Sequence, residues 1–301
     1  MIRRVCVVGA GSIGSLFAAH LAQVAEVSVL TRRRAHAEAL EREGLRVSGR
    51  SDLVGRVCAS TEAADLGEQD LVILACKGVD LEGVAAGLEG AFVGATFVTV
   101  QNGLGAEEIV RRHGDWPLIS GVTFMSGTRH SDTHVEYILD TPTWLGPYDA
   151  PLETVREAAA LIALSGLRAE AFDDLRPAQW AKLIFNATVN AVAALTRLPH
   201  DFHYAENGLG ELVHALVDEG KAVAAAAGVE LREDPWQMNV HATKRGAAHY
   251  PSMLEDVEAH RPTEIELITG ALVREAQRHA VSVPLHAALY ALVRGKEASY
   301  A

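Results

Sequence analysis

The residues best suited to chemistry lie on one strongly apolar stretch. Nearly every position from Ala181 to Leu195 is apolar, yet the stretch contains Lys182, Asn186 and Asn190. On a helix, residues spaced four apart are offset by only about 40° around the axis, so these side chains form one polar stripe. A lysine in such a stripe can serve as a proton donor, and amides can hold the polar groups of a ligand.

The burial of this stripe leaves two explanations open. A lysine and two amides buried without partners would cost several kcal/mol, so they need partners inside the protein or in a ligand. An internal hydrogen-bond network is one explanation, and a bound polar substrate is the other. The second explanation would give the lysine a role as proton donor to the substrate.

Further polar residues lie in the segment PSMLEDVEAHRPTEIELITG. Ser252 and Glu264 are the candidates there, and Thr263 is expected to cap a helix that carries Glu264 and Glu266 in its first turn. On the residues alone, these are ordinary features of a helix start.

A glycine-rich turn near the amino terminus has the GxGxxG pattern of dinucleotide-binding proteins. It follows the apolar run 5–8, opens a predicted helix over 15–21, and consists of Gly9, Ala10, Gly11, Ser12, Ile13 and Gly14. We assign Gly9 to the tight turn, Gly11 to the close approach of a pyrophosphate, and Gly14 to packing of the helix against the strand. Free N–H groups at the helix start then bind the phosphates. The alternative is a glycine-rich turn without a ligand.

The residues after the second predicted strand, 27–30, indicate which dinucleotide binds. NAD enzymes place an acidic side chain there, but this chain has Arg32, Arg33 and Arg34. Arginine pairs with a 2′-phosphate through charge-assisted hydrogen bonds, so we predict NADP as the cofactor, with Arg32 as its ligand. At least one of the other two arginines is expected to lie on a solvated helix start.

Two later predicted strands end in polar residues, Lys77 in ILACK and Asn102 in TVQN. Ligands of an open parallel sheet bind beyond the carboxyl ends of its strands, so both side chains are expected in the cofactor site. Strand ends also use such residues to form turns, and position alone does not decide between these roles.

The elements that must position these residues change character along the chain. Short apolar strands alternate with helical stretches in the first half, which indicates a parallel α/β sheet, and strands between 118 and 147 are expected to complete or extend it. From about 151 onward the pattern is helical. We predict a nucleotide-binding domain over 1–172 and an all-helical substrate and catalytic domain over 173–301.

Composition excludes several classes of function. The chain has 301 residues, 49% of them hydrophobic, and a formal charge of −12, which disfavours nucleic acid or an anionic membrane as a partner. Cys6, Cys58 and Cys76 show no disulfide or zinc pattern. Without a signal peptide or membrane-spanning run, the chain is expected in the cytoplasm. Its oligomeric state stays open, with a homodimer as one option.

Taken in order, GAGSIG, the Lys77 strand end, QNGLG, KLIFNATVN and SMLEDVEAHRPTEIELITG resemble the ketopantoate reductase (2-dehydropantoate 2-reductase) family across nearly the whole chain. The resemblance implies a Rossmann domain that binds NADPH and a helical domain, which together reduce 2-dehydropantoate to pantoate in pantothenate biosynthesis.

The resemblance also implies roles for single residues. Lys182 matches the family's proton donor, and Glu264 matches an acid near that lysine and the substrate. The substrate ligands implied by the matching motifs are Asn102, Asn186, Asn190 and Ser252. For the cofactor, Arg32 and Lys77 match positions associated with the 2′-phosphate and the nucleotide, and Asn102 lies between nicotinamide and substrate.

Two departures from the family concern the substrate: His249 stands where some members have asparagine, and Thr269 stands where asparagine is common. The alternatives are therefore a paralogous reductase of another 2-oxo acid, an opine-type or 6-phosphogluconate-like dehydrogenase, and an NADP-binding sensor without turnover. A metal hydrolase would have to use the cluster His200, Asp201 and His203, whose spacing matches no metal motif.

Overall fold

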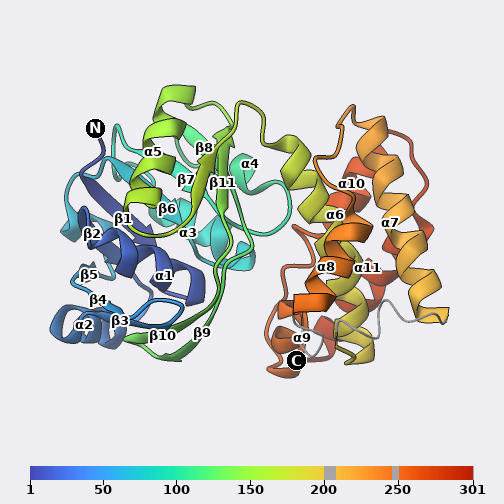
Figure 1. Ribbon diagram of the computed structural model, residues 1–301, viewed down its shortest axis with the longest axis horizontal. Helices are drawn as coiled ribbons and strands as arrows, with labels where there is room; N and C mark the ends of the chain where they lie inside the picture. Colours follow the sequence, from blue (N-terminus) through green and yellow to red (C-terminus); the bar gives the residue numbers. More distant parts are fainter. Residues whose placement is uncertain (200–207, 246–250, 301) are drawn as a thin grey trace. The chain divides into compact units, whose positions relative to one another are not determined.

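The computed structural model describes residues 1–199, 208–245 and 251–300, with backbone only at 239 and 242–245. The chain folds into two compact units (Figure 1). Met1–Gln101 and Ala106–Leu175 form the first unit, and Asn102–Gly105 and Arg176–Ala301 form the second. No helix in the described ranges is both long and apolar enough to cross a membrane.

An eight-stranded, largely parallel sheet forms the centre of the first unit. Its order is β12-β11-β8-β7-β6-β1-β2-β5, and β11 pairs antiparallel with β8. Strands are added outward from β1 in both directions, as in doubly wound nucleotide-binding folds. The strands are β1 (Arg4–Val8), β2 (Glu26–Leu30), β5 (Cys58–Ser60), β6 (Leu71–Leu74), β7 (Thr96–Thr99), β8 (Leu118–Thr123), β11 (Thr143–Pro147) and β12 (Ala169–Ala171).

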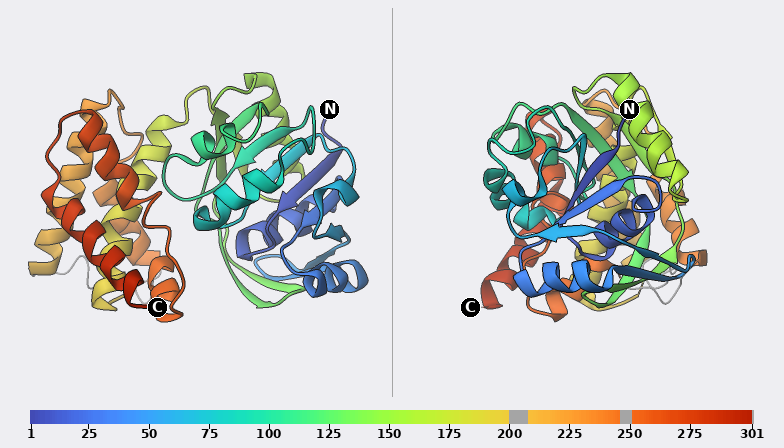
Figure 2. Two further views of the ribbon diagram at one scale, coloured as in Figure 1. Left: turned by 180° about the vertical axis from the view of Figure 1, so that it is seen from behind. Right: turned by 90° about the vertical axis from the view of Figure 1, so that its left-hand side faces the viewer.

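Helices cover both faces of this sheet (Figure 1, Figure 2). Val5 and Val7 of β1 belong to one apolar cluster with α1 and α5, whereas Cys6 and Val8 belong to another with α3 and α4. Because both faces are buried, β6 is a continuous apolar run and β1 is apolar from Val5 to Val8, which is why the sequence predicted these strands. The helices are α1 (Ser12–Leu21), α2 (Arg34–Glu43), α3 (Leu81–Gly87), α4 (Ala106–Arg111) and α5 (Leu152–Leu164), with short 3-10 turns η1 (Ala63–Leu66) and η2 (Gly78–Asp80).

A separate four-stranded sheet corrects one expectation. Its order is β4-β3-β10-β9, with β3 (Leu45–Gly49), β4 (Leu53–Gly55), β9 (Ser126–Ser131) and β10 (His134–Leu139). Of the strands expected to extend the main sheet, only β8 and β11 do so. In β10, buried Val135 and Tyr137 alternate with less buried residues, which is typical of a sheet covered on one face. The short edge strand β12 also falls in a region expected to be wholly helical.

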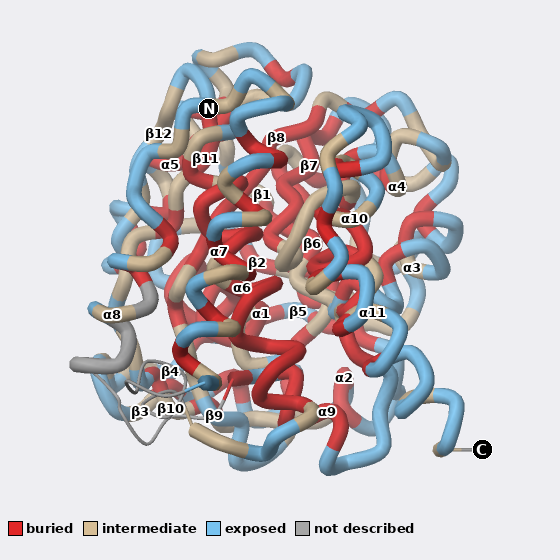
Figure 3. Tube along the Cα trace, turned by 90° about the vertical axis from the view of Figure 1, so that its right-hand side faces the viewer, coloured by how far each residue is buried: buried red, intermediate tan, exposed pale blue. Residues whose placement is uncertain are grey.

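Helix α6 (Arg176–Thr196) is the central element of the second unit, and the helices of this unit pack around it (Figure 1, Figure 3). Most of its residues are buried. Its surrounding elements are α7 (Gly208–Ala226), α8 (Pro235–Arg245), α9 (Ser252–Glu258), α10 (Thr269–Arg278) and α11 (Pro284–Glu297), followed by the 3-10 turn η4 (Ala298–Tyr300). The α/β unit followed by a helical unit confirms the predicted fold class.

Candidate active site

Lys182 lies in the interior of α6, with only 8% of its surface exposed. Burial lowers the pKa of Lys182 to about 8, because removal of water disfavours the ammonium form. The negative charge of Glu264 acts in the opposite direction and raises the pKa of Lys182. The result is an ammonium group that is mostly charged at neutral pH and gives up its proton more readily than a surface lysine.

Glu264 lies in the segment that connects α9 to α10. Its Oε2 accepts a hydrogen bond from Asn102 Nδ2 at 2.9 Å, across 162 positions of sequence. Since Glu264 also acts electrostatically on Lys182, the second unit brings three of the predicted site residues together. We call Lys182, Glu264 and Asn102 the carboxylate cluster.

The helix start expected at Thr263 is not formed. Residues 265–268 form turns, and α10 begins only at Thr269. The Thr263 hydroxyl accepts a hydrogen bond from the Ile265 N–H at 3.2 Å, the bond that a helix N-cap makes. Only turns follow this bond before α10 begins, so Glu264 does not lie in a regular helix.

The loop Asn102–Gly105 places Asn102 against this turn. The Leu104 N–H donates to Leu267 O at 2.9 Å, and Gly103 has φ +99°. A Cβ atom at Gly103 would lie 1.7 Å from that same carbonyl oxygen. Glycine is therefore required at 103 for the close approach, a role that the spacing of the QNGLG motif alone did not reveal.

The remaining predicted substrate ligands differ in their surroundings. Asn186 and Asn190 are buried along α6, with 7% and 4% exposure, one and two turns beyond Lys182. Ser252 is exposed at the first position of α9. No hydrogen bond between described residues ties the Ser252 side chain to the carboxylate cluster.

Of the two departures from the family pattern, Thr269 and His249, only Thr269 lies among the described residues. Thr269 is completely buried, and its hydroxyl finds no hydrogen-bond partner among the described residues. His249 lies outside the described residues, as does the cluster His200, Asp201 and His203. Within the described ranges, no group of three acidic, histidine or cysteine residues is arranged to hold a metal ion.

The glycine-rich turn of the first unit joins β1 to α1. Gly9 has φ +95°, and a Cβ atom there would lie 2.9 Å from Cys76 N. A Cβ atom at Gly14 would lie 1.9 Å from Gly9 O, whereas one at Gly11 would meet no atom within 4 Å. The helix begins at Ser12, three residues earlier than expected, without a side-chain cap on its first N–H groups. Gly9 is therefore packed against the backbone at Cys76 and Gly14 against Gly9, whereas the open space beside Gly11 suits a diphosphate.

The three consecutive arginines have different partners. Arg33 pairs with Asp132 at 2.5 Å, and Arg34 pairs with Glu38 at 2.9 Å. The Arg32 side chain is 86% exposed, and its nearest ion-pair partner is Asp80 at 3.7 Å. Of the three, Arg32 has the longest ion-pair distance and so the guanidinium most easily redirected to a ligand.

Lys77 lies beyond the end of its strand, not at the end as predicted. Strand β6 ends at Leu74, and exposed Lys77 immediately precedes η2. Beside it in the same unit, the Gln101 amide donates to the carbonyl oxygens of Leu74 and Cys76, at 2.8 and 3.0 Å. These bonds fix the backbone just before Lys77.

Comparisons with known proteins agree along the whole chain. Residues 5–150 match the family model "Ketopantoate reductase PanE/ApbA", and residues 174–297 match its C-terminal counterpart. A 2-dehydropantoate 2-reductase of Archaeoglobus fulgidus is 32% identical, over 98% of each chain. The crystal structure of a PanE/ApbA family ketopantoate reductase from Ralstonia eutropha JMP134 has a TM-score of 0.90 at 27% identity, covering 99% of each chain.

The same fold occurs with another named activity. A ternary structure of D-mandelate dehydrogenase with NADH and anilino(oxo)acetate has a TM-score of 0.88 at 24% identity, over 99% of each chain. The family matches, the curated relatives and the nucleotide-binding fold agree on an oxidoreductase with a nicotinamide dinucleotide cofactor. The chain therefore belongs to the ketopantoate reductase family.

Proposed function

We propose that this protein reduces 2-dehydropantoate to pantoate with NADPH, a step of pantothenate biosynthesis. The observation that carries the proposal is the carboxylate cluster: a buried lysine with lowered pKa, beside a carboxylate that binds Asn102, in a member of this family. Such a lysine is suited to proton transfer at neutral pH.

Residues of the first unit fit the cofactor. The diphosphate would lie on the turn from Gly9 to Gly14, where the N–H groups at the start of α1 lack a side-chain cap and the space beside Gly11 is open. Arg32 and Lys77 would bind the 2′-phosphate and the nucleotide. When bound, NADPH supplies the hydride that reduces the carbonyl carbon.

Lys182 would supply the proton. As negative charge develops on the carbonyl oxygen, the ammonium group stabilises it and then transfers its proton to it. Asn186 and Asn190 would donate hydrogen bonds to the substrate, Ser252 would bind its carboxylate, and Asn102 would lie between nicotinamide and substrate. The charge of Glu264 favours the charged form of Lys182 and partly offsets the effect of burial on its pKa.

Location and assembly belong to the same proposal. All three cysteines are free thiols, which suits the reducing cytoplasm. For the assembly we propose a homodimer. Sedimentation of the purified protein would distinguish it from a monomer.

A panel of 2-oxo acids, assayed with NADPH and with NADH, tests the proposal. We expect the highest kcat/KM for 2-dehydropantoate with NADPH. A higher value for another 2-oxo acid would make the protein a paralogous reductase, and tight NADPH binding without turnover of any acid would make it a sensor. A preference for NADH would overturn the assignment of Arg32.

A further inference from the structure

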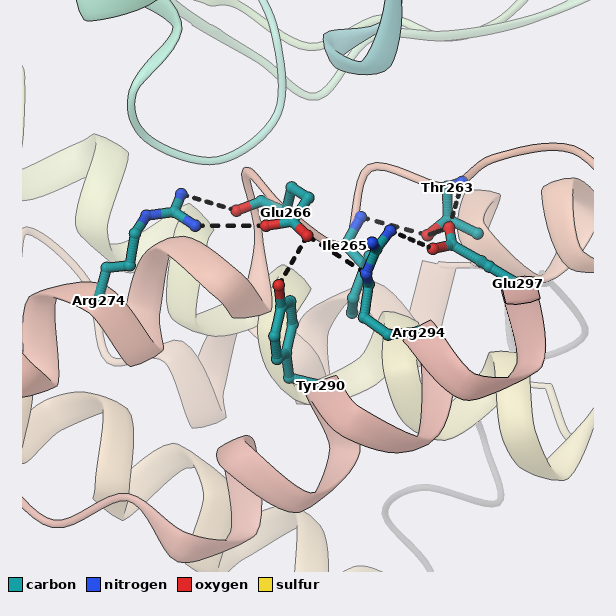
Figure 4. A network of polar contacts seen from close by, with 7 residues as sticks. All are labelled: Thr263, Ile265, Glu266, Arg274, Tyr290, Arg294 and Glu297. Atoms are coloured by element: carbon teal, nitrogen blue, oxygen red, sulfur yellow. Dashed lines mark hydrogen bonds and ion pairs between the residues drawn. The ribbon is translucent and has the colours of Figure 1, made fainter.

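A polar face of α11 holds the segment that carries Glu264. Tyr290, Arg294 and Glu297 are spaced by four and three residues, so their side chains share one side of the helix. Figure 4 shows these three side chains directed toward the segment Thr263–Glu266. Glu264 thus lies between residues that are anchored to one helix.

The first anchor is Glu297. Its Oε1 accepts hydrogen bonds from the Thr263 N–H at 2.7 Å and from the Thr263 hydroxyl at 2.8 Å. That hydroxyl in turn accepts the Ile265 N–H. Thr263 is only 2% exposed, and the Glu297 side chain 11%, so water competes little for these bonds. The Glu297 carboxylate therefore holds Thr263 directly and Ile265 through the Thr263 hydroxyl. These are the two chain neighbours of Glu264.

The second anchor is formed by Tyr290 and Arg294, which hold Glu266. The contacts are made by the Glu266 carboxylate. Its Oε1 accepts the Tyr290 hydroxyl at 2.6 Å and lies 3.3 Å from Arg294 Nε. Arg274 of α10 donates to the Glu266 carbonyl oxygen at 2.9 Å. Arg294 also donates to Glu297 Oε2 at 3.0 Å, so the two anchors form one network (Figure 4).

We propose that Glu297 is a positioning residue for Glu264, and that through the Thr263 turn it controls how the Glu264 carboxylate meets Asn102 and Lys182. Loss of the anchor would free the turn, and the carboxylate would move away from the ammonium. This inference rests on the proposed function only in treating Lys182 as the proton donor. In the described part of the chain, Arg294 and Tyr300 are charged or ionisable groups that act on Glu297, and the charge of Glu264 acts on Lys182.

Two pairs of variants test the anchor. Glu297→Ala removes the acceptor, whereas Glu297→Gln keeps an oxygen that can accept both Thr263 bonds. Thr263→Val removes the hydroxyl, whereas Thr263→Ser keeps it. The matched control is Glu275→Ala, which removes a carboxylate from α10 that pairs with Arg278 and His279 rather than with the Glu264 segment.

The direct measurement is the titration of Lys182 by NMR on protein labelled at lysine. The chain has five lysines, so a Lys182→Arg variant assigns the signal. We expect Glu297→Ala and Thr263→Val to lower the midpoint of Lys182 by about 0.5 pH or more, because the carboxylate no longer favours the charged form. Glu297→Gln, Thr263→Ser and Glu275→Ala should leave it near the wild-type midpoint.

Turnover gives the second measurement. The two disruptive variants should lower kcat by roughly tenfold and shift the alkaline limb of the pH profile to lower pH, with KM for NADPH unchanged. An unchanged Lys182 midpoint in folded Glu297→Ala and Thr263→Val would overturn the positioning role, even if thermal stability fell. If wild-type protein reduces no 2-oxo acid, the proposed function fails, and the NMR titration still decides the role of Glu297.

Discussion

The two sets of candidate site residues differ in how far they are exposed to water. Around the glycine-rich turn, the ligand-binding groups are backbone N–H groups and the exposed Arg32 side chain. In the helical unit, Lys182, Asn186 and Asn190 are almost completely buried. The first arrangement offers donors that stay open to water. The second changes the proton affinity of its central residue, because burial makes that affinity depend on neighbouring charges.

The sharpest test of this contrast removes the buried ammonium. We expect Lys182→Ala to lower kcat by about a thousandfold, since a positioned proton donor is lost. NADPH affinity, which depends on the first unit, should remain nearly unchanged. Steady-state kinetics and fluorescence titration of NADPH measure the two quantities. A folded variant that retains its turnover would remove Lys182 from the mechanism.

A substitution in the glycine turn should have the opposite signature. Gly11→Ala adds a methyl group to open space at φ −75°, so thermal stability should not change. We expect NADPH to bind about tenfold to a hundredfold more weakly, because the methyl group occupies the space proposed for the diphosphate. The contrasting variant is Gly14→Ala, whose Cβ would lie 1.9 Å from Gly9 O and which should also lower the melting temperature. Unaltered NADPH affinity in Gly11→Ala would place the diphosphate elsewhere.

Arg32 allows a test of cofactor choice alone. Arg32→Ala should weaken NADPH binding roughly tenfold and leave NADH binding unchanged, because only NADPH has the 2′-phosphate. Arg34→Ala is the control, since that side chain is equally exposed but paired with Glu38. Equal losses for both cofactors would assign Arg32 to general electrostatics.

The smallest effect concerns pH. Lys182 must be protonated to donate, so the rate of reduction should fall as pH rises through about 8, the lowered pKa of this residue. Glu264→Gln keeps an acceptor for Asn102 but removes the charge that raises this pKa, so the fall should begin at lower pH. A pH profile of kcat identical to that of the wild type would contradict electrostatic coupling of the two residues.

The sequence predicted best what local patterns determine. The run 71–74 is apolar throughout because helices cover both faces of its sheet, and the spacing of Lys182, Asn186 and Asn190 follows from helix geometry. Pairings between distant segments have no such signal. Arg46 pairs with His134 in the second sheet, and neither segment indicates its partner.

The surroundings of Glu264 were beyond local prediction for a related reason. A threonine before acidic residues is typical of a helix start, yet here the Thr263 hydroxyl is engaged by Glu297, a residue of the last helix. The pairing of Asn102 with Glu264 likewise depends on the fold of the whole second unit. A single sequence could suggest these residues as candidates, but not their contacts.

The four residues Asn102–Gly105 have a consequence for how such a protein can be divided or recombined. They are encoded inside the nucleotide-binding half, but they fold with the helices. A gene fragment for 176–301 would encode Lys182 and Glu264 without the amide that binds the Glu264 carboxylate. Exchanging the helical half between homologues would therefore separate Asn102 from the Glu264 that it contacts, so the two halves do not form freely interchangeable modules.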